Sequence, residues 1–392
     1  MTSMLELSPE VRASLPDLVA LRRDFHRHPE LAFAETRTAA RVAAFLEGSG
    51  LRVRTGLGGT GVVAETAPGG RRVMLRVDMD GLPIQEESDA PHASEVPGVM
   101  HACGHDGHTA IGAVAARILA SRRLAGSVRL LFQPAEEGEG GAASVIADGA
   151  LEGVDVVLGI HLWNELPVGT LGVKAGPLMA AVDRLRIVVH GRGGHGGTPH
   201  RAADPVVAAA QLVTALQAVV AREVSPLQSA VVTLASIHGG QAYNVIPDEV
   251  TITGTLRTFD PELRRSMPER LTRIASGVAG AFRCRAEVEI RPGSPPVIND
   301  PGVAEIARRA ALRVVGDAGV VCPEPTMGGE DMALYLERVP GCFVFVGSAD
   351  AGKGLDQPHH SPRFDFSEEA LGIGCEFLLR AAEEALASGE RG

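Results

Sequence analysis

The chain has 392 residues, of which 45% are hydrophobic, and a net charge of −11 from 48 acidic and 37 basic residues. Its length is about twice that of a usual single domain, and its composition is that of a globular protein with a sizeable core, which excludes a disordered chain. The acidic balance and the lack of a clustered basic face argue against a nucleic-acid partner.

Cysteine usage and hydropathy predict where the protein resides. The five cysteines are scattered and form no CxxC pair, which is not the pattern of a disulfide framework. Residues 1–20 contain four charged side chains and therefore no uninterrupted apolar signal region. The most apolar long stretch, 202–221, includes Asp204 and Pro205 and is interpreted as a buried helix, too polar to span a bilayer. We expect a soluble, cytoplasmic protein without a membrane partner.

The first part of the chain has the periodicity of alternating helices and strands. The expected helices cover residues 8–25, 35–47, 106–124 and 141–149. The expected strands cover residues 51–55, 61–66, 72–78, 127–132 and 155–161. This order predicts an α/β sheet covered by helices on both faces.

The pattern changes after Pro177. Strands at 182–190, 229–238, 249–258 and 284–291 and helices at 203–222 and 261–281 follow the β-α-β-β-α-β order of a ferredoxin-like unit. Helix–strand–helix returns at 300–315, 341–347 and 367–387. We therefore predict an α/β domain formed by residues 1–180 and 294–392, interrupted by an inserted α+β domain at 181–293.

One glycine motif is deceptive. Residues Gly56 to Gly61 satisfy the dinucleotide-binding pattern G-x-G-x-x-G. The residues that follow are typical of a strand, so no helix N-terminus is available to receive a pyrophosphate. We interpret this segment as a hairpin turn.

Polar residues gather at the ends of predicted strands, at helix starts and in one C-terminal loop. The clusters are Asp78-Met-Asp80, His101 to His108, Glu136-Glu137, His161 and His359-His360. Thiolate, imidazole and carboxylate are the ligands of zinc and similar cations. The five candidate ligands are Cys103, His105, Glu137, His161 and His360. One closed zinc site needs four ligands, whereas two metals that share a ligand need about this many.

Each of these residues alone has an ordinary structural interpretation. His161 would be a hydrogen-bonded histidine, Glu136-Glu137 a solvated pair and Cys103 a buried small side chain. Their joint occurrence favours a metal site in which one glutamate binds metal and its neighbour takes a proton from water. A cysteine nucleophile stays open as the weaker alternative, while the signatures of zinc deaminases are absent.

Nine segments, in chain order, carry a resemblance to a known family. They are Phe25–Leu31, Asp78–Pro83, Met100–His108, Phe132–Gly138, Gly193–His200, Asn244–Pro247, Gly254–Arg257, Gly328–Asp331 and His359–Pro362. In these segments the chain resembles the hippurate hydrolase and auxin-conjugate (IAA-amino acid) hydrolase subfamily of metal-dependent amidohydrolases. This subfamily lies within the metallopeptidase family of aminoacylase and glutamate carboxypeptidase.

The resemblance implies a three-layer α/β/α catalytic domain with a mixed, zinc-exopeptidase-like sheet, and an inserted ferredoxin-like lid and dimerisation domain. It implies two divalent metal ions, Zn, Mn, Co or Ni, held by the five candidate ligands, with Cys103 in the bridging position that other branches give to aspartate. Glu136 matches the general base and Asp80 the aspartate that orients a ligand. Asp78 takes no ligand role in this comparison.

In the inserted domain the resemblance assigns three further residues. His195 matches the histidine that donates to the oxyanion, often in the partner subunit's active site, and Asn244 and Arg257 match substrate-contacting positions. A homodimer or homotetramer formed through this domain is expected.

The expected reaction is hydrolysis of the amide bond of N-acyl amino acids by a water activated by two metals, releasing a carboxylate and a free amino acid. A dipeptidase or carboxypeptidase with the same site is the alternative within this class. A non-catalytic protein that binds amino-acid conjugates is the alternative outside it, and the intact Glu136 and ligand set argue against it.

Overall fold

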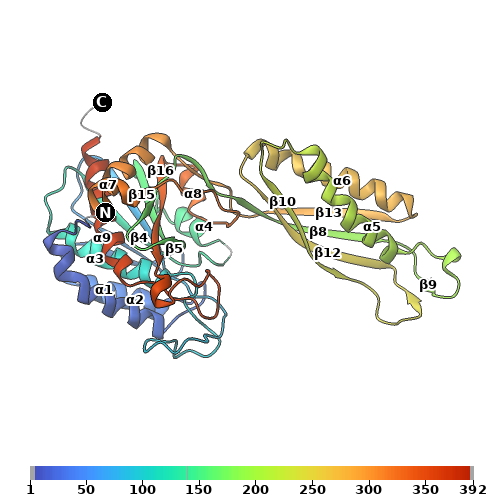
Figure 1. The fold of residues 1–392 in the computed structure, drawn as a ribbon, viewed down its shortest axis with the longest axis horizontal. Helices are drawn as coiled ribbons and strands as arrows, with labels where there is room; N and C mark the ends of the chain where they lie inside the picture. Colours follow the sequence, from blue (N-terminus) through green and yellow to red (C-terminus); the bar gives the residue numbers. More distant parts are fainter. Residues whose placement is uncertain (1–4, 139, 389–392) are drawn as a thin grey trace. The chain divides into compact units, whose positions relative to one another are not determined.

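The structure is a computed structural model that describes residues 5–138 and 140–388. The chain divides into two compact units (Figure 1). Unit 1 comprises Met1–Gly176, Ile298–Glu324 and Leu334–Gly392, and unit 2 comprises Pro177–Val297 and Pro325–Ala333. Residues 325–333 fall within the range predicted for the catalytic domain. They group with unit 2 because the Thr326 backbone N–H donates to Leu178 O at 2.9 Å and its carbonyl accepts from Ala180 N at 3.1 Å.

Unit 1 is built on an eight-stranded sheet with the order β1-β2-β4-β3-β5-β16-β6-β15. Its strands are β1 (Arg52–Leu57), β2 (Gly61–Glu65), β3 (Arg72–Asp78), β4 (Ser127–Gln133), β5 (Val156–Pro167), β6 (Leu171–Gly172), β15 (Val320–Val321) and β16 (Gly341–Ala349). β3 runs parallel to β4 and β5, and β5 parallel to β16, whereas β1, β2 and β4 pair antiparallel. The predicted mixed sheet is confirmed.

Helices lie on both sides of this sheet. They are α1 (Pro9–Arg27), α2 (Thr36–Leu46), α3 (His105–Ser121), α4 (Gly141–Ala147), α7 (Pro301–Gly319), α8 (Ala333–Leu336) and α9 (Glu369–Ser388), with the short 3₁₀ turn η3 at Ala351–Lys353. In Figure 1, α3, α7 and α9 lie on one side of the strands and α4 and α8 on the other. The three-layer arrangement expected from the resemblance is therefore present.

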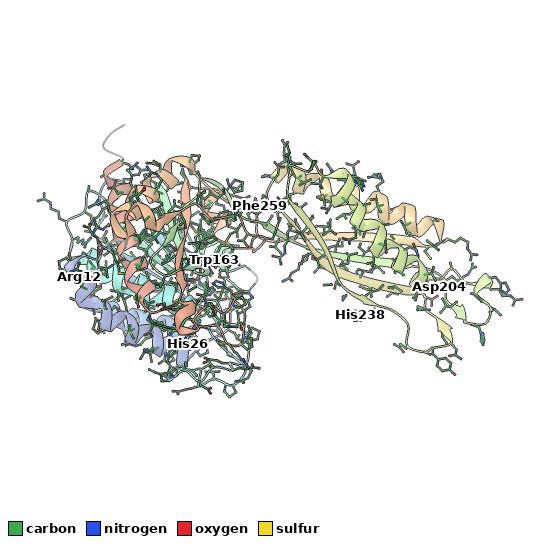
Figure 2. All side chains as sticks on the ribbon, in the orientation of Figure 1. Arg12, His26, Trp163, Asp204, His238 and Phe259 are labelled. Atoms are coloured by element: carbon green, nitrogen blue, oxygen red, sulfur yellow. The ribbon has the colours of Figure 1, made fainter. Side chains whose placement is uncertain are left out.

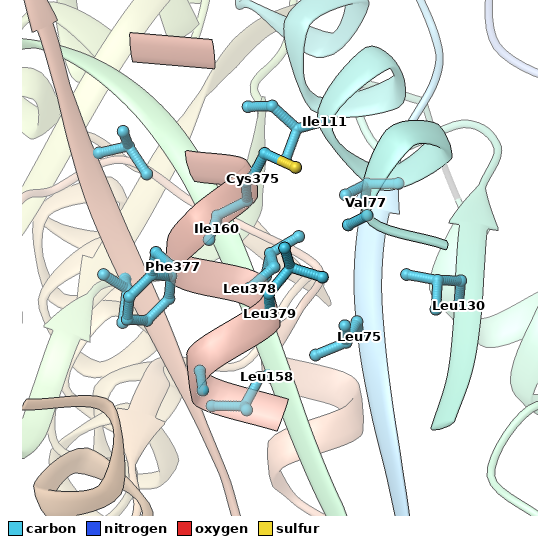
Figure 3. Close-up of a cluster of buried hydrophobic side chains, with 14 of the residues drawn as sticks. Leu75, Val77, Ile111, Leu130, Leu158, Ile160, Cys375, Phe377, Leu378 and Leu379 are labelled. Carbon is cyan, nitrogen blue, oxygen red and sulfur yellow. The ribbon is translucent and has the colours of Figure 1, made fainter. Parts of the chain in front are cut away.

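The core of unit 1 forms where α3 and α9 pack against the parallel strands. Leu378 of α9 and Ile111 of α3 face Leu75 and Val77 of β3 and Ile160 of β5 (Figure 3). All five side chains are at most 1% exposed. Burying a large aliphatic side chain contributes about 1.5–3 kcal/mol, so this layer holds the strand ends that carry the polar clusters in place.

The hairpin interpretation of the glycine motif is confirmed. β1 and β2 pair antiparallel, with Leu57 opposite Gly61, and no helix follows. A Cβ on Gly61 would lie 2.4 Å from the Leu57 carbonyl oxygen, so the close approach of the two strands accounts for this glycine.

Unit 2 contains a four-stranded antiparallel sheet with the order β10-β12-β8-β13. Its strands are β8 (Ala181–His190), β10 (Ala230–His238), β12 (Glu249–Thr258) and β13 (Arg285–Pro292), with helices α5 (Pro205–Ala218) and α6 (Pro261–Ala281). This is the predicted ferredoxin-like order. The smaller pieces of unit 2 are β9 (Gly194–His195), β11 (Val245–Ile246), η1 (Pro199–Arg201) and η2 (Val219–Glu223), whereas β7 (Gly176–Met179) and β14 (Val297–Asn299) span the points where the chain passes between the units.

The prediction of a buried helix at 202–221 is wrong for one face of it. Leu212 and Leu216 of α5 are fully buried, but Val206 and Val207 are 42% and 46% exposed. By length and composition alone, Pro205–Glu223 could cross a membrane, a test that core helices of soluble proteins also pass, and a third of this window is buried in the unit. The prediction failed because hydropathy reports composition, whereas one face of this helix has no partner among the described residues.

Candidate metal centre and active site

The metal-binding segment is formed where β3 ends and α3 begins. Gly104 adopts a φ of 90° and is the N-cap of α3, so the chain turns sharply between Cys103 and His105. An L-residue pays a steric cost in this left-handed region, whereas glycine does not. His105 is fully buried and Cys103 is 9% exposed.

Two groups of ligand-type atoms share Cys103. One is Cys103, His105 and His161, and the other is Cys103, Glu137 and His360. Within each group the ligand atoms lie within 4.8 Å of one another. Cys103 Sγ lies 3.5 Å from His161 Nε2, and His360 Nε2 lies 3.0 Å from Glu137 Oε1. The structure therefore brings all five candidate ligands together as two sets joined by one thiol.

The donors of this cluster fit divalent cations. His105 Nδ1 lies 3.0 Å from the backbone carbonyl of Asp80, so this nitrogen donates to the carbonyl and Nε2 is the atom left for a metal. Among residues 5–138 and 140–388 that Nε2 atom has no hydrogen-bond partner although it is buried, as is typical of a metal-ligand atom. One thiol, one carboxylate and three imidazoles suit the borderline-soft metals Zn, Co, Ni and Mn.

Asp80 connects His105 to the glutamate loop. Its carboxylate accepts the backbone N–H groups of Glu136 at 3.0 Å and Glu137 at 2.9 Å, and its Oδ1 lies 3.3 Å from His105 Nδ1. One buried carboxylate thus orients an imidazole and fixes the backbone of the Glu136-Glu137 pair. The Glu136 carboxylate lies within 4.8 Å of the ligand atoms of His105 and Glu137.

Two residues of the cluster have strained backbones. His360 has a φ of 66° and Ala135, just before Glu136, a φ of 55°. Residues other than glycine adopt this region at a cost of about 1–3 kcal/mol. The His360 backbone N–H donates to Ala102 O at 2.8 Å and the Ala135 N–H to Glu35 Oε1 at 2.8 Å, and these bonds hold the strained turns in place.

Burial and neighbouring acids shift the pKa values of the cluster. Burial, reinforced by Glu137 and Glu136, raises the pKa of the Cys103 thiol well above its usual range. Burial opposes protonation of His105, but Asp78, Asp80 and Glu137 outweigh it and raise the pKa of His105 to about 10. Burial, with His108 and His359 nearby, lowers the pKa of His161 well below its usual range. The cluster is rich in acids, which favours cations.

The three predicted residues of the inserted domain all belong to unit 2. β9 and β11 pair so that His195 lies opposite Val245, and Gly196 N donates to Asn244 O at 2.8 Å. His195 and Asn244 therefore sit together on an exposed loop. Arg257 lies on β12 and donates to the Met327 carbonyl, so it is not part of that loop.

Asp78, His108 and His359 have no role predicted from the sequence, yet the structure places them around the ligands. Asp78 accepts from His108 Nδ1 at 2.6 Å, and His359 Nε2 lies 2.9 Å from the Leu162 carbonyl. The available signal was proximity, because His108 and His359 lie in the same motifs as His105 and His360. Which ring nitrogen faces which partner is not encoded in that spacing.

Comparison with known proteins agrees with this geometry. Residues 74–384 match peptidase family M20/M25/M40. N-acetyl-L-cysteine deacetylase of Bacillus subtilis is 43% identical over 95% of this chain and 89% of its own length. The IAA-amino acid hydrolase ILR1-like 4 of Arabidopsis thaliana is 38% identical over 91% of this chain and 83% of its own.

A solved structure has the same fold. The YXEP protein of Bacillus subtilis, a dinuclear metal-binding peptidase of the M20 family, is 39% identical, covers 96% of this chain and 99% of its own, and superposes with a TM-score of 0.84. Together with the two ligand groups, this relative supports a site for two divalent metal ions.

Proposed function

The chain belongs to peptidase family M20/M25/M40, and on this basis we propose that it hydrolyses the amide bond of N-acyl amino acids, releasing a carboxylate and a free amino acid. The observation that carries the proposal is the pair of ligand groups joined by Cys103, with the Glu136 carboxylate beside them. The deacetylase and the IAA-amino acid hydrolase to which the chain is similar are both named for cutting such conjugates.

The roles of the residues follow from their positions. Cys103, His105, Glu137, His161 and His360 would hold the two ions, which when bound supply the Lewis acidity that polarises an amide carbonyl and acidifies water. Glu136 takes the proton of the attacking water as the new C–O bond forms. Glu136 then delivers that proton to the nitrogen as the C–N bond breaks. Hydrogen bonds to Asp80 fix the positions of the Glu136 backbone and of His105 for this transfer.

His195, Asn244 and Arg257 are proposed to act on the substrate. Gly197 N–H donates to His195 Nδ1 at 2.9 Å, so a neutral His195 carries its proton on Nε2 and can donate it to an oxyanion. Asn244 adjoins it on the same loop, and Arg257 offers a guanidinium for the substrate carboxylate.

Amino-acid release from a substrate panel tests this proposal. Chelator-stripped protein is assayed with N-acetyl, N-benzoyl and indole-acetyl amino acids and with dipeptides, each with and without added manganese, zinc or cobalt. We expect release that depends on added metal and is fastest with an N-acyl substrate. Folded protein that binds metal but releases nothing would contradict the proposal and favour a protein that binds conjugates without cutting them.

A dipeptidase or carboxypeptidase activity is the second candidate, because the YXEP relative is called a peptidase. The same panel separates the two activities. A ratio of kcat/KM that favours dipeptides over N-acyl amino acids would establish the peptidase.

We also propose that two copies associate through unit 2 and that His195 serves the partner subunit's active site. The exposed face of α5 carries no charged residue over Pro205–Ala218 and includes Val206 and Val207. An uncharged helix face of this kind is typical of an interface. His195 lies on an exposed loop of the same unit.

A mixing experiment tests both parts. Glu136→Gln and His195→Ala are each expected to inactivate the enzyme. If His195 acts on the partner, random mixed dimers should regain about a quarter of wild-type activity, because half are hybrids with one complete site of two. No recovery in mixed dimers would contradict action on the partner, and a monomer in sedimentation velocity would contradict the dimer.

The interface has its own control. Val207→Glu on α5 is expected to give monomers and to prevent recovery in the mixture. Thr272→Glu, a matched substitution on the exposed face of α6, should change neither. Equal effects of the two variants would argue against α5 as the contact.

A further inference from the structure

The peptide group of Leu162, directly after the ligand His161, binds three imidazoles. Its N–H donates to His108 Nε2 at 2.8 Å, and its carbonyl lies 2.7 Å from His161 Nδ1 and 2.9 Å from His359 Nε2. A carbonyl only accepts, so both of these ring nitrogens donate to it. The bond from Nδ1 leaves the lone pair of His161 on Nε2, the atom that faces Cys103 Sγ at 3.5 Å.

The second ring nitrogen of His108 is also hydrogen-bonded. Its Nδ1 donates to Asp78 Oδ1 at 2.6 Å, and Asp78 Oδ2 accepts from Arg76 Nη1 at 2.6 Å. All three side chains are fully buried. Both nitrogens of His108 are therefore engaged, and it could bind a metal only by breaking one of these bonds. The compact group formed by Asp78, His105 and His108 is thus occupied by its own hydrogen bonds rather than being a third metal position.

The same residue links two elements that carry ligands. His108 lies one turn after His105 on α3, with ring centroids 5.4 Å apart, while Leu162 belongs to β5. The His108 ring also packs edge-on against His161 at 4.7 Å between centroids. A hydrogen bond from β5 to this ring sets the separation of His105 and His161, the two imidazoles of one ligand group.

We propose that His108 and His359 are positioning residues that direct His161 Nε2 through the Leu162 peptide, and that Asp78 and Arg76 hold His108 for this purpose. The inference rests on the metal site of the proposed function and deepens it. It predicts an unequal effect, because the group with His105 and His161 depends on Leu162, whereas the group with Glu137 and His360 is held by Asp80 and by Ala102.

Cobalt binding to His108→Phe tests the proposal. Phenylalanine keeps a planar ring in the space but forms neither hydrogen bond. Chelator-stripped wild-type and variant protein are titrated with Co²⁺ and followed by equilibrium dialysis and by the cobalt–thiolate absorption of Cys103. We expect one of the two ions to bind about 10–100-fold more weakly in the variant, as is usual when an outer partner of a ligand is lost, while the other binds as in wild type. Asp78→Asn, which keeps an acceptor for His108 Nδ1, should show a smaller loss.

His101→Phe is the matched control. His101 is equally buried in the same motif, and its ring nitrogens have no hydrogen-bond partner within residues 5–138 and 140–388. The His101→Phe variant should bind both cobalt ions with wild-type affinity. Unchanged affinities in His108→Phe, or equal losses in His101→Phe and His108→Phe, would overturn the proposal.

Two further variants apply if His108→Phe does not fold. His359→Phe removes one donor to Leu162 O, and unchanged binding of both ions in His359→Phe and Asp78→Asn together would also overturn the inference. Because the readout is metal binding, wild-type protein that binds two cobalt ions but hydrolyses nothing would contradict the proposed function and leave this inference intact.

Discussion

Glu136→Gln is expected to lower kcat by roughly 10²–10⁴-fold, the contribution usually made by a positioned general acid–base. Glutamine fills the same space but cannot take the proton of the attacking water. Metal content should stay at two ions per chain, because Glu136 is the neighbour of the ligand Glu137 and not a member of either group that shares Cys103. KM should change little, since the lost step is proton transfer and not substrate binding.

Glu137→Gln is the control for this prediction. The same chemical change at Glu137 removes a metal ligand. The Glu137→Gln variant should therefore lose metal as well as activity. Elemental analysis and steady-state kinetics on the two variants separate the roles. A Glu136→Gln enzyme with wild-type kcat would disprove the proton transfer described above, and one that has lost metal would make Glu136 a ligand.

Much of the fold was predictable because hydrophobic periodicity reports burial directly. The fully buried strand β4 and the alternating strand β8 lie where their patterns placed them, and the ferredoxin-like order of unit 2 is confirmed. The periodic signal failed for α5, whose apolar side chains are exposed on one face. It also missed the grouping of residues 325–333 with unit 2, because that grouping depends on backbone hydrogen bonds of Thr326, which leave no pattern in the sequence.

The residues of the candidate site were predictable because the motifs contain side chains that typically bind metal or transfer protons. The motifs and the resemblance named the five ligand candidates and Glu136, and the structure brings them together, although their individual roles stay predictions. The contacts behind them were not predictable. His108 and His359 have the same side chain as the ligands beside them, and only the direction of each ring nitrogen distinguishes a positioning residue from a ligand. That direction is set by Asp78 and Leu162, which are distant from His108 in sequence.

Cys103→Ala is expected to abolish measurable turnover and to weaken binding of both ions, because the thiol is the one side chain shared by the two ligand groups. The loss of metal affinity should exceed the roughly 10–100-fold that is typical when a hydrogen-bond partner of a ligand is removed. Dialysis against a metal buffer followed by elemental analysis measures it. Cys103→Asp should retain part of the binding and activity, since a carboxylate can also bridge two cations and other branches of the family are expected to carry aspartate here.

The same variants decide the cysteine-nucleophile alternative. A nucleophilic cysteine is activated by a lowered pKa, whereas burial and the neighbouring glutamates raise the pKa of Cys103. Its thiolate forms only when a cation replaces the proton, so wild-type protein should bind metal more weakly as pH falls and should release more protons on metal loading than Cys103→Asp. If Cys103→Ala kept both ions at wild-type affinity and was still inactive, the thiol would be a nucleophile and not a bridge. Retained activity in Cys103→Asp would exclude the nucleophile, because a carboxylate cannot form the thioester that such a mechanism requires.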